Sequence, residues 1–311
     1  MSNILVVGSS NTDMVVRTAS HPAPGQTVLG GQFFMNPGGK GANQAVAAAR
    51  FGGQVTFITK TGNDVFGATA IEQFKKEGID CRYIGVHPDA ASGVALITVD
   101  AKGENAIVVA PGANGTLSIE DVSAAKEAIG LTDMVLLQLE IPLATVEHAV
   151  ALATAAGKCV ILNPAPAQAL SDELLKQLSF ITPNETEAET LTGIAVNNPE
   201  SALEAAKVLV SRGVATAIIT LGSEGALIWD GEKSTHIQAP KVNVVDTTAA
   251  GDVFNGVLAV ALADGMYVTG ATAFAIQAAA ISVTRPGAQS AAPTKEEILS
   301  FIEQDRSEKR I

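Results

Sequence analysis

The residues best suited to chemistry lie towards the C-terminus, in a run of small side chains that holds two carboxylates. This run, Asp246–Gly256, reads Asp-Thr-Thr-Ala-Ala-Gly-Asp-Val-Phe-Asn-Gly. We expect a helix to begin among its alanines, where small side chains leave backbone N–H groups open to an anion. Such a site can stabilise a transferring phosphoryl group, and Asp252 beside it could accept a proton from a substrate hydroxyl. The alternative is that Asp246 and Asp252 only cap the helix.

A second glycine-rich run lies near the N-terminus and also precedes an expected helix. Residues Pro37–Gln44 read Pro-Gly-Gly-Lys-Gly-Ala-Asn-Gln. Glycines allow the backbone to approach a ligand closely, and the helix behind them would aim its free N–H groups at that ligand. Lys40 and Asn43 add polar side chains. A ligand-binding loop is one interpretation, and a tight turn into a packed helix is the other.

Two further segments could contact a nucleotide. Asn184 and Glu187 stand one helical turn apart, so they could organise a hydrated Mg²⁺ near phosphates, or simply form a solvated acidic helix start. Residues 220–225 form a glycine-containing loop after an apolar strand. This loop suits the rim of an adenine or ribose site, or a plain hairpin.

Several familiar catalytic motifs are missing from the sequence. It has no G-x-x-x-x-G-K-[ST] loop, no G-x-G-x-x-G after the first expected strand, no zinc spacing and no G-x-S-x-G elbow. The 4 histidines are scattered, and we expect each to lie at the surface or in a turn. Cys81 and Cys159 form neither a disulfide framework nor a metal cluster, and their apolar neighbours predict that both are buried.

Composition limits the classes of function. The chain has 311 residues, 47% hydrophobic and 17% charged, which excludes a disordered chain. A net charge of −12 makes it a poor candidate for binding nucleic acid or an anionic membrane. The N-terminus lacks the basic segment of a signal peptide. The uncharged stretch Gly265–Thr284 is rich in Ala, Gly, Thr and Ser, so we expect a buried helix there and a cytoplasmic protein.

The expected elements alternate between short apolar strands and helices. The strands span Ile4–Val7, Val55–Thr59, Met134–Leu139, Cys159–Leu162, Phe180–Ile181 and Ala217–Thr220, and the helices span Ala42–Arg50, Asp64–Glu77, Ser118–Ile129, Ala144–Ala156 and Pro199–Ser211. This alternation implies an α/β fold, with a parallel sheet covered by helices on both faces.

Two regions break the alternation. Met14–Arg17 with Thr27–Met35, and Gly93–Asp100 with Asn105–Ala110, predict antiparallel strand pairs. They fall between the parallel units, so we expect a small sheet at one edge of the large one. A cover of this kind can close over an active site. The alternative is a set of ordinary edge strands.

Together, these segments resemble the ribokinase-type (PfkB) family of sugar kinases from Ile4 to about Ile302. The run Gly38–Ala45 resembles the family's sugar-side glycine signature, Asp246–Asp252 its C-terminal signature, and Asn184-x-x-Glu187 its N-x-x-E motif. The resemblance implies one kinase domain over residues 1–311 with a three-layer α/β/α fold. Its central sheet would be mostly parallel, with lid strands inserted at about 14–35 and 93–110. In the family the lids of two subunits clasp, which implies a homodimer.

The activity that the resemblance implies is ATP-dependent phosphorylation of D-ribose at its 5-hydroxyl. Asp252 would be the general base, and residues 248–251 would form the anion hole for the γ-phosphate, through Thr248, Ala249, Ala250 and Gly251. Asp13 would bind ribose hydroxyls. The rest of the sugar site would consist of Asn11, Thr12, Gly39, Lys40, Gly41, Ala42, Asn43 and Glu140.

The resemblance also implies sites for ATP, Mg²⁺ and K⁺. ATP would contact Asn184, Thr220, Leu221, Gly222, Ser223, Glu224, Gly225, Gly251 and Asp252, with Glu187 near Mg²⁺. By position, K⁺ ligands would be Asp246, Thr248, Ser282, Arg285 and Gly287. Two positions depart from the family. Ala291, next to Ser290, stands where a Ser often occurs, and Ile276, next to Gln277, stands where some members place Asn or His beside adenine.

Two other functions stay open on the residues alone. One is a kinase of the same family for deoxyribose, another pentose or a nucleoside. The other is a sugar-binding regulator without catalytic activity. A pure binder needs no base, so the presence of Asp252 with the complete anion-hole run argues against the regulator.

Overall fold

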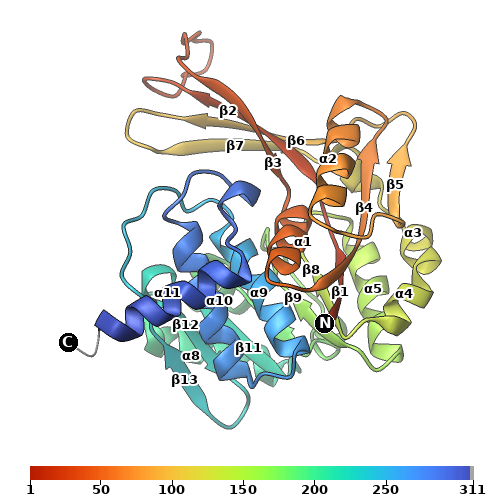
Figure 1. Ribbon diagram of the computed structural model, residues 1–311, viewed down its shortest axis with the longest axis vertical. Coiled ribbons are helices and arrows are strands. Elements are labelled where there is room, and N and C mark those ends of the chain that lie inside the picture. Colours follow the sequence, from red (N-terminus) through yellow and green to blue (C-terminus); the bar gives the residue numbers. More distant parts are fainter. Residues whose placement is uncertain (309–311) are drawn as a thin grey trace.

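The large sheet forms the centre of the molecule. A computed structural model describes residues 1–308 and contains two sheets (Figure 1). The larger has nine strands in the order β13-β12-β11-β10-β9-β8-β1-β4-β5. Its strands are β1 (Asn3–Val7), β4 (Gln54–Gly62), β5 (Ile84–His87), β8 (Met134–Leu137), β9 (Cys159–Leu162), β10 (Phe180–Ile181), β11 (Thr216–Thr220), β12 (Ala226–Trp229) and β13 (Ser234–Ile237). Neighbours from β5 to β11 are parallel, and only β12 and β13 add antiparallel pairs.

Both faces of this sheet are buried, which explains the continuous apolar runs of its strands. Alternate side chains of one strand enter different cores. In β1, Leu5 and Val7 join one apolar cluster and Ile4 and Val6 join the other. The inner strands therefore contribute to two cores, one for each helical layer, whereas the edge strands β5 and β13 contribute to one.

The helices form the two outer layers, so the expected α/β/α arrangement is confirmed. One core takes side chains from α1 (Lys40–Arg50), α9 (Ala250–Ala263), α10 (Val268–Ser282) and α11 (Lys295–Glu308), with Phe74 of α2 (Val65–Lys76) at its edge. The other takes side chains from α3 (Ile119–Ala124), α4 (Lys126–Leu131), α5 (Leu143–Ala155), α6 (Asp172–Leu175), α7 (Glu185–Thr192) and α8 (Pro199–Ser211).

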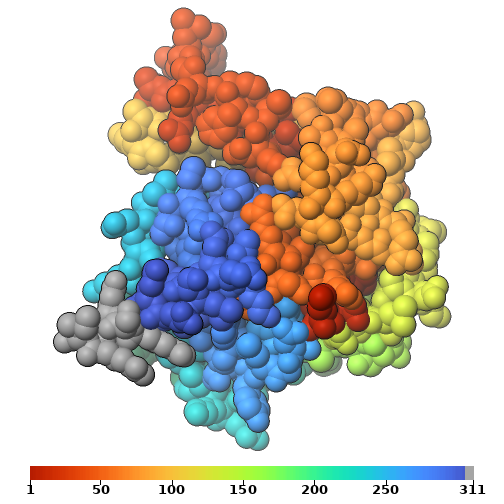
Figure 2. Space-filling view, viewed as in Figure 1, coloured from red at the N-terminus to blue at the C-terminus, as the bar shows by residue number. Residues whose placement is uncertain are grey.

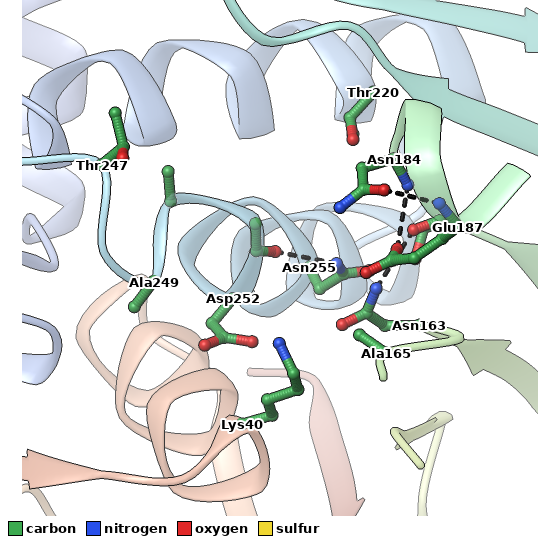
Figure 3. A pocket seen from close by; sticks show the side chains of 13 residues that line it. Lys40, Asn163, Ala165, Asn184, Glu187, Thr220, Thr247, Ala249, Asp252 and Asn255 are labelled. Carbon is green, nitrogen blue, oxygen red and sulfur yellow. Dashed lines mark hydrogen bonds between the residues drawn. The ribbon is translucent and has the colours of Figure 1, made fainter. Parts of the chain in front are cut away.

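Close packing of α1 on α9 brings the two glycine-rich runs together. A Cβ on Gly256 of α9 would lie 2.6 Å from the carbonyl oxygen of Gln44 in α1, so the two backbones touch at this point. Ala45 and Ala48 of α1 are fully buried. Because both helices begin on the same side of this contact, their first turns face one another (Figure 3).

The small sheet is a four-stranded lid in the order β3-β2-β6-β7. Its strands are β2 (Asn11–Arg17), β3 (Phe33–Gly38), β6 (Gly93–Val99) and β7 (Asn105–Ala110). The two predicted antiparallel pairs are present, and parallel pairing of β2 with β6 joins them into one sheet. Figure 2 shows this lid standing out from the main body at one end of the molecule.

Several predictions about single elements were wrong. The strand expected from Thr27 begins only at Phe33. The helix expected over 118–129 is divided at Ala125, although the predicted Ser118–Asp121 cap is present. Cys159 is exposed and is therefore not a core residue, whereas Cys81 is half-buried and packs against one apolar core; both are free. Cys159 is the first residue of β9 and faces solvent before the buried part of that strand begins.

The Gly265–Thr284 stretch forms α10, which is buried against α9 as expected. Within residues 1–308, no helix is long and apolar enough to cross a membrane.

Candidate active site

A cleft of about 220 Å³ lies at the carboxyl ends of β9, β10 and β11. This edge of a parallel sheet is where ligands bind in open α/β folds. Figure 3 shows the first turns of α1, α7 and α9 converging on the cleft. It is lined by Lys40, Asn163, Ala165, Thr182, Asn184, Glu187, Thr220, Thr247, Ala249, Ala250, Gly251, Asp252 and Asn255.

The start of α9 has an unusual backbone. Ala249 has φ of 59°, and within residues 1–308 it is the only residue other than glycine with a positive φ. No side chain caps this helix start, and the N–H of Ala250 makes only a long 3.3 Å bond to the carbonyl of Thr247. A Cβ on Gly251 would meet nothing within 4 Å, so this residue borders open space. The result is a set of aimed N–H groups beside room for an anion.

Asp252 lies in this first turn and is only 5% exposed. Its Oδ2 accepts a hydrogen bond from the Asn43 amide at 2.8 Å, and its Oδ1 accepts one from the Gln44 amide at 3.0 Å. Both donors come from the first turns of α1. The carboxylate is therefore held at a fixed orientation next to the uncapped helix start.

The side chain of Lys40 points towards Asp252 across the cleft (Figure 3). Burial alone would lower the pKa of Lys40, but the carboxylates of Asp252, Glu140 and Glu187 outweigh that effect and hold its pKa above the usual value. Lys40 is therefore a permanent cation between the two helix starts. A cation in this position is suited to an anionic ligand that bridges them.

The sugar end of the predicted site is a cluster of carboxylates under the lid. Burial raises the pKa of Asp13 to about 7, and the neighbouring carboxylates of Glu140 and Asp252 add to this rise. Glu140 accepts hydrogen bonds from the Ser9 hydroxyl and, at 3.1 Å, from the backbone N–H of Lys40. Hydroxyl groups of a polyol are the natural partners for such carboxylates, because they donate hydrogen bonds.

Several other residues predicted to bind sugar do not line this cleft. They pack against neighbouring backbone or line a different pocket. Gly39 has φ of 89°, and a Cβ on Gly41 would lie 2.6 Å from the Ser9 nitrogen, so both allow close backbone packing. Ala42 is fully buried and donates its N–H to the Ser9 carbonyl at 2.8 Å. Asn11 and Thr12 line a separate, mostly apolar pocket against α2.

At the end of the cleft predicted to bind the nucleotide, Asn184 and Glu187 cap α7 and also line the cleft. The Asn184 Oδ1 accepts from the Glu187 N–H at 2.8 Å, and the Glu187 Oε2 accepts from the Asn184 N–H at 2.9 Å. Burial raises the pKa of Glu187, and the charges of Asp252 and Glu185 add to this effect. The helix cap is therefore present, and the same two residues also line the cleft. The second carboxylate oxygen of Glu187 takes no part in the capping box.

The loop 220–225 forms a tight turn at the end of β11. Thr220 borders the cleft, Leu221 is buried, and the 3-10 helix η2 (Gly222–Glu224) includes Ser223. A Cβ on Gly225 would overlap the carbonyl of Ile237 in β13, so the turn packs directly on the neighbouring strand. Of the six residues predicted to contact ATP in this loop, Thr220 is the one that lines the cleft.

The two segments predicted to hold K⁺ lie side by side. The carboxylate of Asp246 accepts from the Gly287 N–H at 2.9 Å and from the Thr248 N–H at 2.9 Å. The carbonyl of Val283 accepts from the N–H groups of Val245 and Asp246 at 2.7 and 3.2 Å. These bonds join the loop before α9 to the turn after α10.

Side chains around this turn have other partners. Arg285 forms an ion pair with Glu297 at 2.7 Å, the Ser282 hydroxyl donates to the Ala279 carbonyl, and the Ser290 hydroxyl donates to the Pro286 carbonyl. Backbone carbonyls are therefore the groups of Ser282, Arg285 and Gly287 that suit a cation. Ala291 is buried in η3 (Gln289–Ala291); Ile276 is buried and Gln277 half-buried in α10.

The comparisons with known proteins agree with this geometry. A model described as pfkB family carbohydrate kinase matches residues 1–295. The chain belongs to this family. It is 46% identical to a ribokinase of Haemophilus influenzae over 96% of this chain and 98% of that protein. It is 39% identical to a deoxyribokinase of Salmonella typhimurium over 96% of this chain and 98% of that protein. The solved structure of Arabidopsis thaliana ribokinase complexed with ribose and ATP matches with a TM-score of 0.89 at 30% identity, covering 97% of this chain and 99% of that one.

This carbohydrate kinase also has site residues that the sequence motifs did not assign. They are buried polar side chains that connect α1, α9 and the carboxyl ends of the strands: Gln44, Gln138, Asn163, Thr182 and Asn255. Asn163 and Thr182 each follow directly after a parallel strand. Their position at the carboxyl edge of the sheet was a usable signal. Gln44 and Asn255 lie inside the two motif runs without an assigned role, and nothing in the sequence distinguishes Gln138.

Proposed function

We propose that this kinase transfers the γ-phosphoryl group of ATP to the 5-hydroxyl of D-ribose, giving D-ribose 5-phosphate and ADP. The observation that carries the proposal is the position of Asp252, a buried carboxylate in the first turn of a helix whose start has no side-chain cap. The relative named ribokinase and the Arabidopsis thaliana ribokinase complexed with ribose and ATP support ribose as the acceptor.

The proposed reaction uses the two ends of the cleft. Asp13 and Glu140 accept hydrogen bonds from ribose hydroxyls and hold the 5-hydroxyl near Asp252. The Asp252 carboxylate takes the proton of that hydroxyl while its oxygen forms a bond to the γ-phosphorus. The bond from this phosphorus to the oxygen that bridges it to the β-phosphate breaks at the same time, and ADP leaves. N–H groups at Ala249–Gly251, together with Lys40, stabilise the charge on the transferring group.

The residues fit Mg²⁺ as an ion held mainly by phosphates and water. Described residues contain no cluster of three or more His, Cys, Asp or Glu that could hold a metal. Glu187 lines the cleft with one oxygen outside its capping bond, so it can orient a water of a hydrated Mg²⁺. When bound, Mg²⁺ neutralises charge on the phosphates.

The residues also fit a K⁺ site beside the anion hole. Asp246 and the carbonyls of Thr248, Ser282, Arg285 and Gly287 offer oxygen atoms on two segments that hydrogen bonds hold together. Backbone carbonyls can replace the hydration shell of K⁺. An ion there would stiffen the loop that leads into the start of α9.

We further propose a homodimer through the lid and a cytoplasmic location. One face of the lid exposes the apolar side chains of Phe33, Met35, Leu96 and Val108, which lie side by side across the sheet, and such a patch favours a partner surface. Sedimentation analysis would test the dimer, because Val108→Lys should shift the protein to monomers. Both cysteines are free, which agrees with a reducing compartment.

A second acceptor has an observation in its favour. The relative named deoxyribokinase is 39% identical over nearly the whole chain, so 2-deoxyribose is the main competitor for the sugar site. A site that binds a hydroxyl penalises a substrate that lacks it, because buried polar groups then stay unpaired. We expect ribose to have the higher kcat/KM.

The test is an ADP-release assay over pentoses, hexoses, 2-deoxyribose and nucleosides, with the product identified by NMR. We expect the highest kcat/KM for D-ribose and a phosphate on its 5-oxygen. Equal or better efficiency with 2-deoxyribose would replace the proposed acceptor. The absence of sugar-dependent ADP release with every compound would support the regulator instead.

A further inference from the structure

A buried network of amide side chains supports Asp252 from behind, and Gln44 stands at its centre. Gln44 is fully buried in α1, and its Nε2 donates to Oδ1 of Asp252 and to Oδ1 of Asn163, both at 3.0 Å. Its Oε1 accepts from Nε2 of Gln138, which is also fully buried. Every polar atom of the Gln44 side chain therefore has a partner.

The direction of these hydrogen bonds follows from the one partner that cannot change its role. Nδ2 of Asn163 lies 3.1 Å from the backbone carbonyl of Thr182, which can only accept. The Asn163 oxygen must therefore face Gln44, and Gln44 must present its NH₂ group to Asn163 and Asp252. The Gln44 oxygen then faces Gln138, which donates to it. The network has one consistent orientation, and it ends with hydrogens aimed at the ionised carboxylate.

The same network also reaches the anion hole. The Thr182 hydroxyl donates to Oδ1 of Asn255 at 2.6 Å, and Nδ2 of Asn255 donates to the carbonyl of Gly251 at 2.8 Å. Gly251 is the neighbour of Asp252 in the first turn of α9. The proton acceptor and the backbone that would hold the phosphoryl group are thus connected through Asn163 and Gln44.

Neutral amides are well suited to hold a carboxylate that must take up a proton. Lys40 lies near Asp252 but forms no direct ion pair with it. The direct partners of the carboxylate are the amides of Asn43 and Gln44. A cation bonded directly to the carboxylate would favour its ionised form more strongly and oppose proton transfer to it. An amide donor fixes the direction of a carboxylate oxygen with a smaller effect on its charge. It also leaves the second lone pair of that oxygen free.

We propose that Gln44 is a positioning residue that acts on the reaction through Asp252. Its two amide hydrogens tie the carboxylate to Asn163 and so set the direction from which Asp252 meets the sugar hydroxyl. Gln44 touches neither sugar nor nucleotide in this arrangement. The inference rests on the proposed role of Asp252 as the base.

The experiment compares Gln44→Met, which keeps the length and removes both amide hydrogens, with Gln44→Glu, which places an accepting oxygen against Asp252. Turnover, the KM values for ribose and ATP, and calorimetric ribose binding are measured on each. Thr145→Val is the matched control, because it removes a buried hydrogen bond, from the Thr145 hydroxyl to the Leu117 carbonyl, in α5 away from the cleft. Asp252→Asn is assayed in parallel.

We expect Gln44→Met to lower kcat by about 10- to 100-fold, the size of effect that a small misplacement of a reacting group produces. Gln44→Glu should lower it further. The KM and calorimetric Kd for ribose should change less than about threefold, since binding groups stay in place, and Thr145→Val should keep wild-type kcat.

Two results would overturn the proposal. One is a kcat of Gln44→Met within threefold of wild type when Asp252→Asn is inactive, and the other is a loss confined to KM. If both Gln44 variants fail to fold, Gln138→Met tests the proposal instead, because it removes the donor that holds the Gln44 oxygen. We expect it to lower kcat at least threefold with unchanged KM. An unchanged kcat would reject the proposal. An active Asp252→Asn would instead remove the base, and with it the proposed mechanism.

Discussion

The carboxylate of Asp13 lies directly over the α-carbon of Gly38. A Cβ on Gly38 would overlap both carboxylate oxygens and the carbon between them. Gly38 ends β3 and Asp13 lies on the neighbouring strand β2, so the lid sheet itself positions the Asp13 side chain that we propose binds the sugar. Only a residue without a side chain leaves that position open.

Gly38→Ala should therefore weaken sugar binding through Asp13. Gly38 does not have a positive φ, so alanine is allowed by the backbone, and its methyl group displaces the carboxylate. Loss of a hydrogen bond to a charged group costs about 1.5–3 kcal/mol, which corresponds to a rise of roughly 10- to 100-fold in the KM for ribose. The KM for ATP should change little.

The matched control is Gly130→Ala in α4, where a Cβ would meet nothing within 4 Å. Its kinetics should equal those of the wild type. A Gly38→Ala enzyme with wild-type KM for ribose would show that Asp13 does not bind the sugar.

The raised pKa of Asp13 predicts that its charge lowers the free energy of unfolding, and that this effect depends on pH. Because the pKa rises from 3.8 to about 7 on folding, the folded state binds this proton more readily than the unfolded chain between these values. Stability from this group therefore falls as pH rises through that window, and the full cost is present above it. Asp13→Asn carries no charge, so it should gain stability over wild type as pH increases.

Thermal unfolding at about pH 5 and about pH 8 measures this effect. We expect the Tm difference, variant minus wild type, to be larger at the higher pH by about 2 °C or more. The same variant should lose ribose affinity at both values. An equal Tm difference at both pH values would contradict the burial of an ionised Asp13.

The neighbouring segments around Asp246 and Gly287 predict activation by K⁺. An ion held by their carbonyls would fix the anion-hole backbone before phosphate arrives and so raise kcat without touching substrate. K⁺ should activate more than Na⁺, because carbonyls held on two separate segments suit the larger ion better. Turnover is measured in K⁺, Na⁺ and tetramethylammonium salts at constant ionic strength. Identical rates in all three would rule out the ion site and leave the kinase activity unaffected.

Local sequence patterns predicted most of the fold. Strands β1, β9 and β10 and the cap of α3 are encoded by residues adjacent in the chain, and the structure contains all four where the sequence predicted them. The parallel pairing of β2 with β6 depends on residues about 80 positions apart, such as Asn11 and Gly93, and no short pattern encodes it. The exposure of Cys159 likewise depends on where the sheet begins to be covered.

The site shows the same division. Asp252 stands in a run whose composition is recognisable in the sequence. Gln44 ends the other run, Pro37–Gln44, but its role comes from contacts with Gln138, Asn163 and Asp252, which lie 94 or more residues away. A buried glutamine in a helix has no signature of its own. Its importance becomes visible only when the partners of its amide are known.

Asp252→Asn shows whether Asp252 accepts the proton of the sugar hydroxyl. This substitution keeps the shape of the side chain and removes the proton acceptor. Turnover and calorimetric ribose binding are measured on the same sample of each protein. We expect a fall in kcat of about 10²–10⁴-fold, with a Kd for ribose that changes much less. Turnover within threefold of wild type would contradict this role of Asp252.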